Sequence, residues 1–272
     1  MLLSVLTVLQ PRGRKGTTGW TIRNHHIPIS MKLQGRSEAI PDKGAAVLFS
    51  GGKDSTCACA KAIARGYAMA CLVTMFSENK ESYMLHTPNI EATELSARAI
   101  GLPRFVARTA GRKEEEILDI KSAIVQAKKE FGFRTLVTGA IASAYQKERI
   151  ERIAKDCDLQ LFSPLWGVDQ EQYLRALVSE GYRFVITSVS AEGLDKSWLG
   201  CEIGQEEIEK LIRLSREFGF NPALEGGEAE TLVLDCPIFK NGRIKILHSS
   251  VEWNGYFGLL RIEKAILEEK AK

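Results

Sequence analysis

The six residues SGGKDS at positions 50–55 have the types and the order of a loop that binds phosphate. Gly51 and Gly52 carry no Cβ, so the backbone can turn sharply and bring its N–H groups close to an anion. Lys53 adds a compact positive charge that suits phosphate oxygens. We therefore predict that this segment holds the phosphates of a nucleotide.

The polar side chains of the segment add to this interpretation in different ways. Ser50 and Ser55 supply hydroxyl donors, and Ser55 is also suited to cap a helix. Asp54 repels phosphate directly; it is suited to hold Mg²⁺ or to lie at the positive end of a helix. The Walker A pattern GxxxxGK[ST] and the dinucleotide pattern GxGxxG are both absent. The alternative is an ordinary glycine-rich turn capped by a serine.

The surrounding elements must bring this loop to the edge of a sheet. Apolar runs of strand length alternate with segments of helical spacing, which predicts a parallel sheet with helices on both faces. In such a sheet the loops after the strands line the edge where ligands bind. The expected strands are residues 45–49, 69–75, 104–107 and 135–138, and the expected helices are residues 55–65, 90–100, 113–131 and 145–156.

Two other strand ends carry candidate contacts for the nucleotide. Met75 ends the second predicted strand, where the base would lie; plain core packing is the alternative. Gly139 follows the fourth strand and would let a ligand approach closely, and Ser143 would donate to a phosphate. The alternative there is a tight turn between strand and helix.

The pattern changes beyond about residue 162, where helical and strand-like segments mix. This mixture predicts a second domain of the α+β class. We expect a nucleotide-binding domain at residues 44–162 and a smaller domain at 163–272. Residues 1–43 show neither helical nor strand periodicity. We expect them to be a basic, disordered extension, or to precede a true start of translation at Met31. The expected elements of the second domain are helices at 169–180 and 204–218 and strands at 183–189, 232–234 and 243–251.

Over most of residues 44–272 the chain resembles the diphthine–ammonia ligase (diphthamide synthase) family of PP-loop, or N-type, ATP pyrophosphatases. SGGKDS matches the PP-loop signature SGGxDS at every defined position. Ala229 stands where the family pattern EGGExET commonly has an aromatic residue, which leaves the shape of the pocket open at that point. The other matching segments are SYMLHTPN at 82–89, VTGAIASAYQKERIE at 137–151, SPLWG at 163–167 and EGGEAETLVLDCP at 225–237.

The resemblance implies a HUP-like fold (adenine nucleotide α-hydrolase-like) and an AMP-forming ligase. The diphthine carboxylate on elongation factor two would attack the α-phosphate of ATP, and ammonia would then displace AMP from the acyl-adenylate. ATP, Mg²⁺ and ammonium are the implied cofactors and co-substrate. Two negative reactants meet in such a site, so the protein must neutralise charge and align the reactants.

The motif and the resemblance together give three sets of candidate residues. Lys53, Asp54 and Ser55 are the catalytic candidates, and Asp54 is also the candidate metal ligand. The ATP-binding candidates are Ser50, Gly51, Gly52, Lys53, Asp54, Ser55, Met75, Gly139 and Ser143. The substrate-binding candidates are His86, Tyr145, Arg149, Glu225, Gly226, Gly227, Glu228 and Glu230. The glutamates suit the trimethylammonium group of diphthine, Mg²⁺ or ammonium; a solvated turn and a charged helix face are the alternatives.

Charge and cysteine content set limits on partners and location. The net charge is +3; residues 1–43 hold seven Lys/Arg and two Asp/Glu, or +5, which leaves −2 for the rest. This weighs against broad binding of nucleic acid.

The six cysteines lack CxxC and zinc-finger spacing, so we expect reduced, mostly buried thiols. Residues 2–9 are too short to span a bilayer. We expect a cytoplasmic protein, and the sequence leaves a homo-oligomer open.

Two other functions stay open. One is another PP-loop enzyme, which would adenylate a different carboxylate or a tRNA base. Sulfur-transferring PP-loop enzymes often use CxxC pairs, which this chain lacks. RNA-handling PP-loop enzymes tend to be basic, whereas residues 44–272 carry a net charge of −2. A nucleotide-binding sensor of the same fold would do no chemistry. Formation of AMP with candidate acceptors separates an enzyme from a sensor.

We expect Lys53→Ala to abolish AMP formation and to leave the fold intact, because it removes a phosphate contact from a loop that we expect to be exposed. AMP released from ATP measures the activity, and circular dichroism measures the fold. A variant that turns over like the parent would show that the loop does not hold the phosphates.

Overall fold

The computed structural model describes residues 6–10, 21–25, 44–78, 89–112 and 115–270. The chain forms two compact units, Met1–Ala39 and Ile40–Lys272. In the first unit, β1 (Leu6–Gln10) pairs antiparallel with β2 (Thr21–His25). The sequence pattern indicated no strand in this segment. His86 lies outside the described residues.

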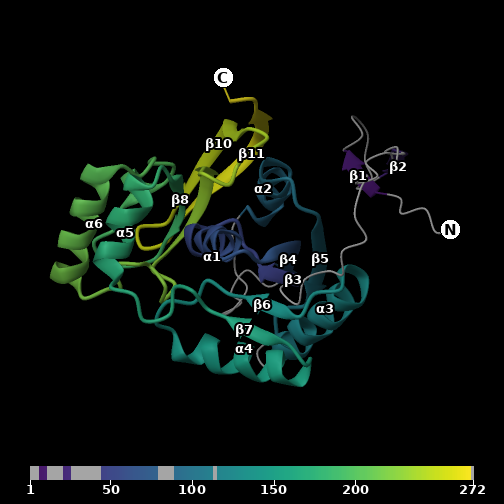
Figure 1. Cartoon of the computed structure of the whole chain (residues 1–272). Helices are drawn as coiled ribbons and strands as arrows, with labels where there is room; N and C mark the ends of the chain where they lie inside the picture. Colours follow the sequence, from purple (N-terminus) through teal and green to yellow (C-terminus); the bar gives the residue numbers. More distant parts are fainter. Residues whose placement is uncertain (1–5, 11–20, 26–43, 79–88, 113–114, 271–272) are drawn as a thin grey trace. The chain divides into compact units, whose positions relative to one another are not determined.

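A parallel sheet of five strands forms the first half of the second unit (Figure 1). Its order is β5-β4-β3-β6-β7, so the chain leaves the central strand β3 in one direction and later returns to its other side. This change of direction between β3 and β6 is the place where open α/β sheets bind ligands. The strands are β3 (Gly44–Leu48), β4 (Ala68–Ser77), β5 (Arg104–Thr109), β6 (Thr135–Val137) and β7 (Gln160–Phe162).

Helices cover both faces of this sheet, as the sequence predicted. Successive residues of a strand point to opposite faces, and β3 follows this rule. Val47 packs in one hydrophobic cluster with Ala58 of α1, whereas Ala46 packs in another with Ile124 of α3 and Ile153 of α4. The helices are α1 (Lys53–Ala64), α2 (Thr93–Ile100), α3 (Glu115–Phe131) and α4 (Ala144–Asp156), and the 3-10 turn Ile90–Ala92 precedes α2.

An antiparallel sheet with the order β10-β11-β8-β9 forms the second half, which confirms the predicted change of class. Two helices accompany it, α5 (Gln170–Ser179) and α6 (Gln205–Phe218). β7 and β11 were not among the strands that the sequence predicted. The strands are β8 (Arg183–Val189), β9 (Ala229–Asp235), β10 (Arg243–Trp253) and β11 (Gly258–Glu268).

One hydrophobic core joins the two halves. The cluster that holds Val47 and Ala58 also contains Leu174 of α5, Ile186 of β8 and Val233 of β9. The α1 side of the parallel sheet is therefore packed against the elements of the second half. The parallel sheet ends at Phe162, and the division into domains at that point stays a prediction.

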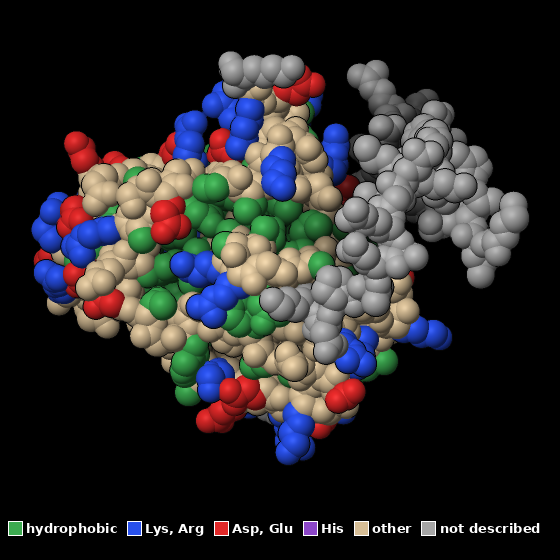
Figure 2. All heavy atoms as spheres, in the orientation of Figure 1, with side chains coloured by type: hydrophobic (Ala, Val, Ile, Leu, Met, Phe, Trp, Pro, Cys, Tyr) green, Lys and Arg blue, Asp and Glu red, His purple; other side chains and the backbone are tan. Residues whose placement is uncertain are grey.

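The described surface carries charges of both signs. In Figure 2, Lys and Arg side chains are interspersed with Asp and Glu around the visible face. No helix among the described residues is both long and apolar enough to span a bilayer. All six cysteines are free, and five of them are buried, with Cys201 partly exposed.

Candidate active site

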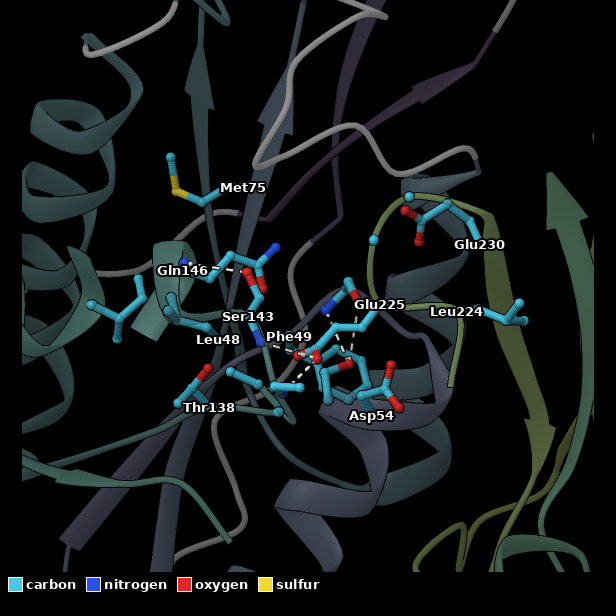
Figure 3. A pocket seen from close by; sticks show the side chains of 18 of the residues that line it. Leu48, Phe49, Asp54, Met75, Thr138, Ser143, Gln146, Leu224, Glu225 and Glu230 are labelled. Carbon is cyan, nitrogen blue, oxygen red and sulfur yellow. Dashed lines mark hydrogen bonds between the residues drawn. The ribbon is translucent and has the colours of Figure 1, made fainter. Parts of the chain in front are cut away.

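A cavity of about 740 Å³ lies where the carboxyl ends of β3, β4 and β6 face the loop before β9 (Figure 3). Residues of both halves line it, so neither half forms it alone. The structure thus brings most of the sequence candidates together. Those that line the cavity are Ser50, Asp54, Ser55, Met75, Gly139, Ser143, Glu225, Gly226, Gly227 and Glu230.

The turn after β3 has a backbone shape that requires glycine. Gly51 has a φ of +80°, in the left-handed region. A Cβ on Gly52 would lie 3.3 Å from both the carbonyl and the hydroxyl oxygen of Thr231. α1 begins at Lys53 without a side-chain cap on Gly52, so the following N–H groups of its first turn have no intrahelical acceptor and suit an anion.

The two serines of the loop hold its shape. The hydroxyl oxygens of Ser50 and Ser55 lie 3.2 Å apart, and Ser50 Oγ accepts from the N–H of Gly52 at 3.3 Å. Ser55 Oγ also donates to the carbonyl oxygen of Gly52 at 3.2 Å. Both side chains line the cavity. They therefore preorganise the turn while staying within reach of a ligand.

An edge strand of the antiparallel sheet fixes the loop from the other side. Within the described sheet β9 pairs only with β8, and its second edge carries backbone groups that need partners. Val233 N–H donates to the carbonyl oxygen of Gly51 at 3.0 Å. The Thr231 hydroxyl accepts from Lys53 N–H at 3.1 Å. The phosphate loop thus covers the open edge of β9.

Lys53 is buried, so the expectation that the loop is exposed is wrong at this residue. Its side chain is 2% exposed, and Nζ lies 2.9 Å from Oδ2 of Asp54. The hydroxyl of Tyr173, on α5, donates to Oδ1 of Asp54 at 2.8 Å. Asp54 therefore has one donor on each oxygen. Because Lys53→Ala removes one of them inside the protein, the variant will lose stability as well as a positive charge.

Tyr173 is a contact that the sequence analysis missed. It occupies an apolar position of an amphipathic helix and is 6% exposed, a pattern that indicates core packing. Burial raises the pKa of its hydroxyl well above the usual value, so Tyr173 stays a neutral donor to Asp54. Ser188 and Ser190 also line the cavity without any motif that would have marked them.

Asp54 is suited to a magnesium ion that binds together with phosphate. Its side chain is 27% exposed and lines the cavity, and each carboxylate oxygen keeps a further lone pair. Mg²⁺ is usually held by one or two carboxylates plus substrate phosphates. No three His, Cys, Asp or Glu side chains gather into a metal cage in the described part of the chain, so the phosphates would supply the remaining ligands.

Gly139 has no room for a side chain, because the backbone after β6 lies against the backbone at the start of α1. A Cβ on this residue would lie 2.7 Å from the carbonyl carbon of Asp54 and 2.8 Å from the nitrogen of Ser55. The end of β6 therefore touches the first turn of α1. Gly139 also lines the cavity, and the close approach of a ligand there stays a prediction. Met75 lines the cavity from β4, and its contact with the base stays a prediction.

The carboxylate of Glu225 binds the turn between β6 and α4. It accepts hydrogen bonds from the N–H groups of Ile141, of Ala142 at 2.5 Å and of Ser143 at 3.2 Å (Figure 3). Successive N–H groups at a helix N-terminus form a nest that favours an anion. Glu225 thus ties the loop before β9 to the nucleotide-binding half, and its charge is already matched.

The two other glutamates of this segment differ from each other. The carboxylate of Glu228 accepts from Asn221 N–H at 3.0 Å and from Gly226 N–H at 2.7 Å, which closes the loop on itself. The carboxylate of Glu230 points into the cavity (Figure 3) and has no hydrogen bond or ion pair to another described residue. Burial raises the pKa of Glu230 to about 7.

Three described substrate candidates, Tyr145, Arg149 and Glu228, do not line the cavity. The guanidinium carbon of Arg149 is 3.3 Å from the ring centroid of Tyr145, and both side chains are on α4. Among the described residues of that helix, Ser143 at its cap, Gln146 and Ile150 line the cavity. The substrate roles of Tyr145 and Arg149 stay predictions.

We expect Gly139→Ala to weaken nucleotide binding, because the added methyl group displaces the backbone at the start of α1. Overpacking of this kind costs about 1–3 kcal/mol, so the Tm should fall. The Kd for a non-hydrolysable ATP analogue, measured by calorimetry, should rise several-fold.

Gly66→Ala is the matched control for this effect. Gly66 has a φ of +82°, and a methyl group added there would meet open space, so alanine costs about 1–2 kcal/mol through backbone strain alone. We expect a lower Tm with an unchanged Kd. Equal Kd values for the two variants would contradict the role given to Gly139.

We expect Glu225→Gln to loosen the loop before β9, because a neutral amide is a weaker acceptor than a carboxylate for the three N–H groups. Hydrogen bonds to charged groups contribute about 1.5–3 kcal/mol each when buried, and this site is partly exposed. Amide exchange at Ile141, Ala142 and Ser143 should therefore accelerate by at least tenfold. Unchanged exchange at these residues would refute the contact.

Comparison with known proteins finds one family. The model described as diphthamide synthase N-terminal domain matches residues 43–161, and the model described as diphthamide synthase C-terminal domain matches residues 169–267. Together they cover most of the chain.

Relatives named diphthine–ammonia ligase give the same result. The protein of Rattus norvegicus is 32% identical over 249 residues, which are 83% of this chain and 92% of the relative. The protein of Homo sapiens is 34% identical over 226 residues, which are 76% of this chain and 83% of the relative. The longer protein of Schizosaccharomyces pombe is 31% identical over 209 residues, or 71% of this chain and 34% of the relative. With two matching family models, and with the rat and human relatives above 30% identity along most of their length, the chain belongs to the diphthine–ammonia ligase (diphthamide synthase) family.

Proposed function

We propose that this protein is an ATP-dependent ligase that converts the diphthine carboxylate of elongation factor two into an amide, with ammonia as the nitrogen donor. The observation that carries the proposal is the SGGKDS turn at the switch point of the sheet, facing a cavity that an acid-rich loop of the second half completes. The names of the relatives supply diphthine and ammonia as the reactants, and the resemblance supplies elongation factor two as the protein that carries diphthine.

The first half-reaction joins two anions, and the loop is suited to that task. The diphthine carboxylate attacks the α-phosphorus of ATP, the bond to the β-phosphate oxygen breaks, and acyl-adenylate and pyrophosphate form. Open N–H groups at the start of α1 and the positive charge of Lys53 stabilise the leaving pyrophosphate. The carboxylate is already ionised, so this step needs no general base.

A magnesium ion would be held by Asp54 together with the phosphates. When bound, it would neutralise charge on the phosphate oxygens. Lys53 and Tyr173 orient the Asp54 carboxylate toward that position through the hydrogen bonds on its two oxygens. Ser50 and Ser55 keep the turn in the shape that receives the phosphates.

The second half-reaction makes the amide. Ammonia attacks the carbonyl carbon of the acyl-adenylate, a C–N bond forms, and the C–O bond to AMP breaks. Water would compete for the same carbon, so the intermediate must be kept away from solvent. The walls of the cavity come from both halves of the unit, so the intermediate would lie between them.

The division of labour between the halves is also part of the proposal. Residues 44–162 bind the nucleotide, and residues 163–272 contact the acceptor protein. Enzyme and acceptor would meet in the cytoplasm. Tyr145 and Arg149, beside the cavity on α4, would contact the acceptor near its mouth. We assign residues 1–43 no role in the reaction.

Mass spectrometry of elongation factor two tests the proposal. After incubation of the diphthine-bearing factor with this protein, ATP, Mg²⁺ and ammonium, we expect the acceptor side chain to become an amide and AMP to appear in equal amount. The reaction without ATP is the control. Bound ATP with no amide and no AMP would overturn the proposed acceptor, and AMP with another carboxylate or with tRNA would favour a different PP-loop enzyme.

A further inference from the structure

We infer that Glu230 is the general base of the second half-reaction: its carboxylate takes a proton from ammonium in the cavity and so generates the ammonia that attacks the acyl-adenylate. The inference rests on the proposed function, since it names the group that activates its co-substrate. Ammonium has no lone pair, so one proton must leave before the C–N bond can form. A positioned base near the nitrogen performs this task.

The contacts of the neighbouring acids single out Glu230. The oxygens of Asp54 face the ammonium group of a lysine and the hydroxyl of a tyrosine, and those of Glu225 face three backbone N–H groups. The oxygens of Glu228 face two backbone N–H groups. Of these four acids, Glu230 is the one whose carboxylate has no partner among the described residues. Its oxygens are therefore open to a cation in the cavity.

The strand register puts a second polar group beside it. Glu230 lies directly opposite Ser188 in the antiparallel pair of β8 and β9, so the two side chains share one face with Cβ atoms about 4.5–5.5 Å apart. Ser188 is 6% exposed and also lines the cavity. Ammonium donates hydrogen bonds in every direction and accepts none. A carboxylate with a hydroxyl oxygen beside it suits such an ion.

The surroundings of Glu230 bring the pKa of its carboxylate into a range that suits proton transfer. Burial raises the pKa of Glu230 to about 7, Lys53 from α1 opposes the rise, and Asp54 and Glu228 add to it. An exposed glutamate, with a pKa of about 4.3, holds a proton too weakly to compete for one on ammonium. A base whose pKa lies near the working pH is largely available and still accepts a proton.

The protons and bonds balance in a short sequence. Ammonium transfers one proton to the Glu230 carboxylate, and the resulting ammonia forms the C–N bond. The C–O bond to AMP breaks, and the electron pair leaves with the AMP phosphate. The nitrogen then loses its second proton to water, which leaves the neutral amide. Glu230 returns its proton to solvent when the products leave.

The test separates the two half-reactions in the full chain with diphthine-bearing elongation factor two, ATP and Mg²⁺. Exchange of labelled pyrophosphate into ATP, dependent on the acceptor and run without ammonium, reports adenylation. Amide formation from ammonium reports the second step. Hydroxylamine is uncharged near neutral pH and forms a hydroxamate, so it reports the second step without the need for a base.

For Glu230→Gln we expect pyrophosphate exchange and hydroxamate formation to stay within a few-fold of the parent protein. Amide formation from ammonium should fall about 100-fold or more, because general base catalysis contributes on this scale. The residual rate should rise about tenfold per pH unit below the pKa of ammonium, since free ammonia then comes only from solution. The control Glu206→Gln, an exposed acid on α6, should leave all three rates unchanged.

Two outcomes would decide against this role, and a third would decide against the proposed function. An unchanged ammonium rate and pH profile in Glu230→Gln would overturn the inference alone. A joint loss of exchange, hydroxamate and amide would also overturn it, because Glu230 would then act in adenylation. A parent protein that shows no acceptor-dependent exchange would instead overturn the proposed function on which the inference rests.

Ser188→Ala is a second variant that keeps the carboxylate. We expect its KM for ammonium to rise several-fold with a smaller change in kcat, and its rate with hydroxylamine to stay near the parent value. Equal losses with ammonium and hydroxylamine would contradict the shared position of Ser188 and Glu230. A Tm close to that of the parent confirms that both variants are folded.

Discussion

The contact between the phosphate loop and the open edge of β9 is the constraint on which the site depends. A turn with two glycines has many conformations in isolation, and its polar backbone groups need partners when they are buried. Val233 and Thr231 supply these partners, to the carbonyl oxygen of Gly51 and the N–H of Lys53. The strand therefore selects one shape of the turn. The starting point of α1 and the direction in which its first N–H groups face both follow from that choice.

The segment that leads into β9 adds a second connection to the nucleotide-binding half. Its three acids are alike in the sequence but have different surroundings. Glu225 reaches across to the β6–α4 turn, Glu228 closes its own loop, and Glu230 is left facing the cavity. One short stretch of chain thus fixes the phosphate loop, attaches itself to the opposite wall and presents an open carboxylate. The position of that carboxylate relative to the SGGKDS loop is set by its neighbours Thr231 and Val233, which contact the loop from the same strand.

Local patterns predicted the architecture, whereas contacts between distant residues did not follow from them. The apolar runs predicted four of the five parallel strands, and the SGGKDS turn predicted a loop that does line a cavity, because each signal is contained in a few adjacent residues. β7 has only three residues, too few to show a period, and β11 is stabilised by its pairing with β10. Tyr173 meets Asp54 across 119 positions, and no periodicity encodes such a meeting. The burial of Lys53 was missed for the same reason, since the elements that cover it are remote in sequence.

The hydrophobic core shared by the two halves has a thermodynamic consequence. Val47 and Ala58 on the nucleotide side pack in one cluster with Ile186 and Val233 of the antiparallel sheet, so the loss of either sheet would expose the other. A ligand that binds only the folded state stabilises every element that folds with its site. Nucleotide held by the loop would therefore also stabilise the antiparallel sheet. Occupancy of the cavity by nucleotide would then appear as a greater resistance of the antiparallel sheet to unfolding.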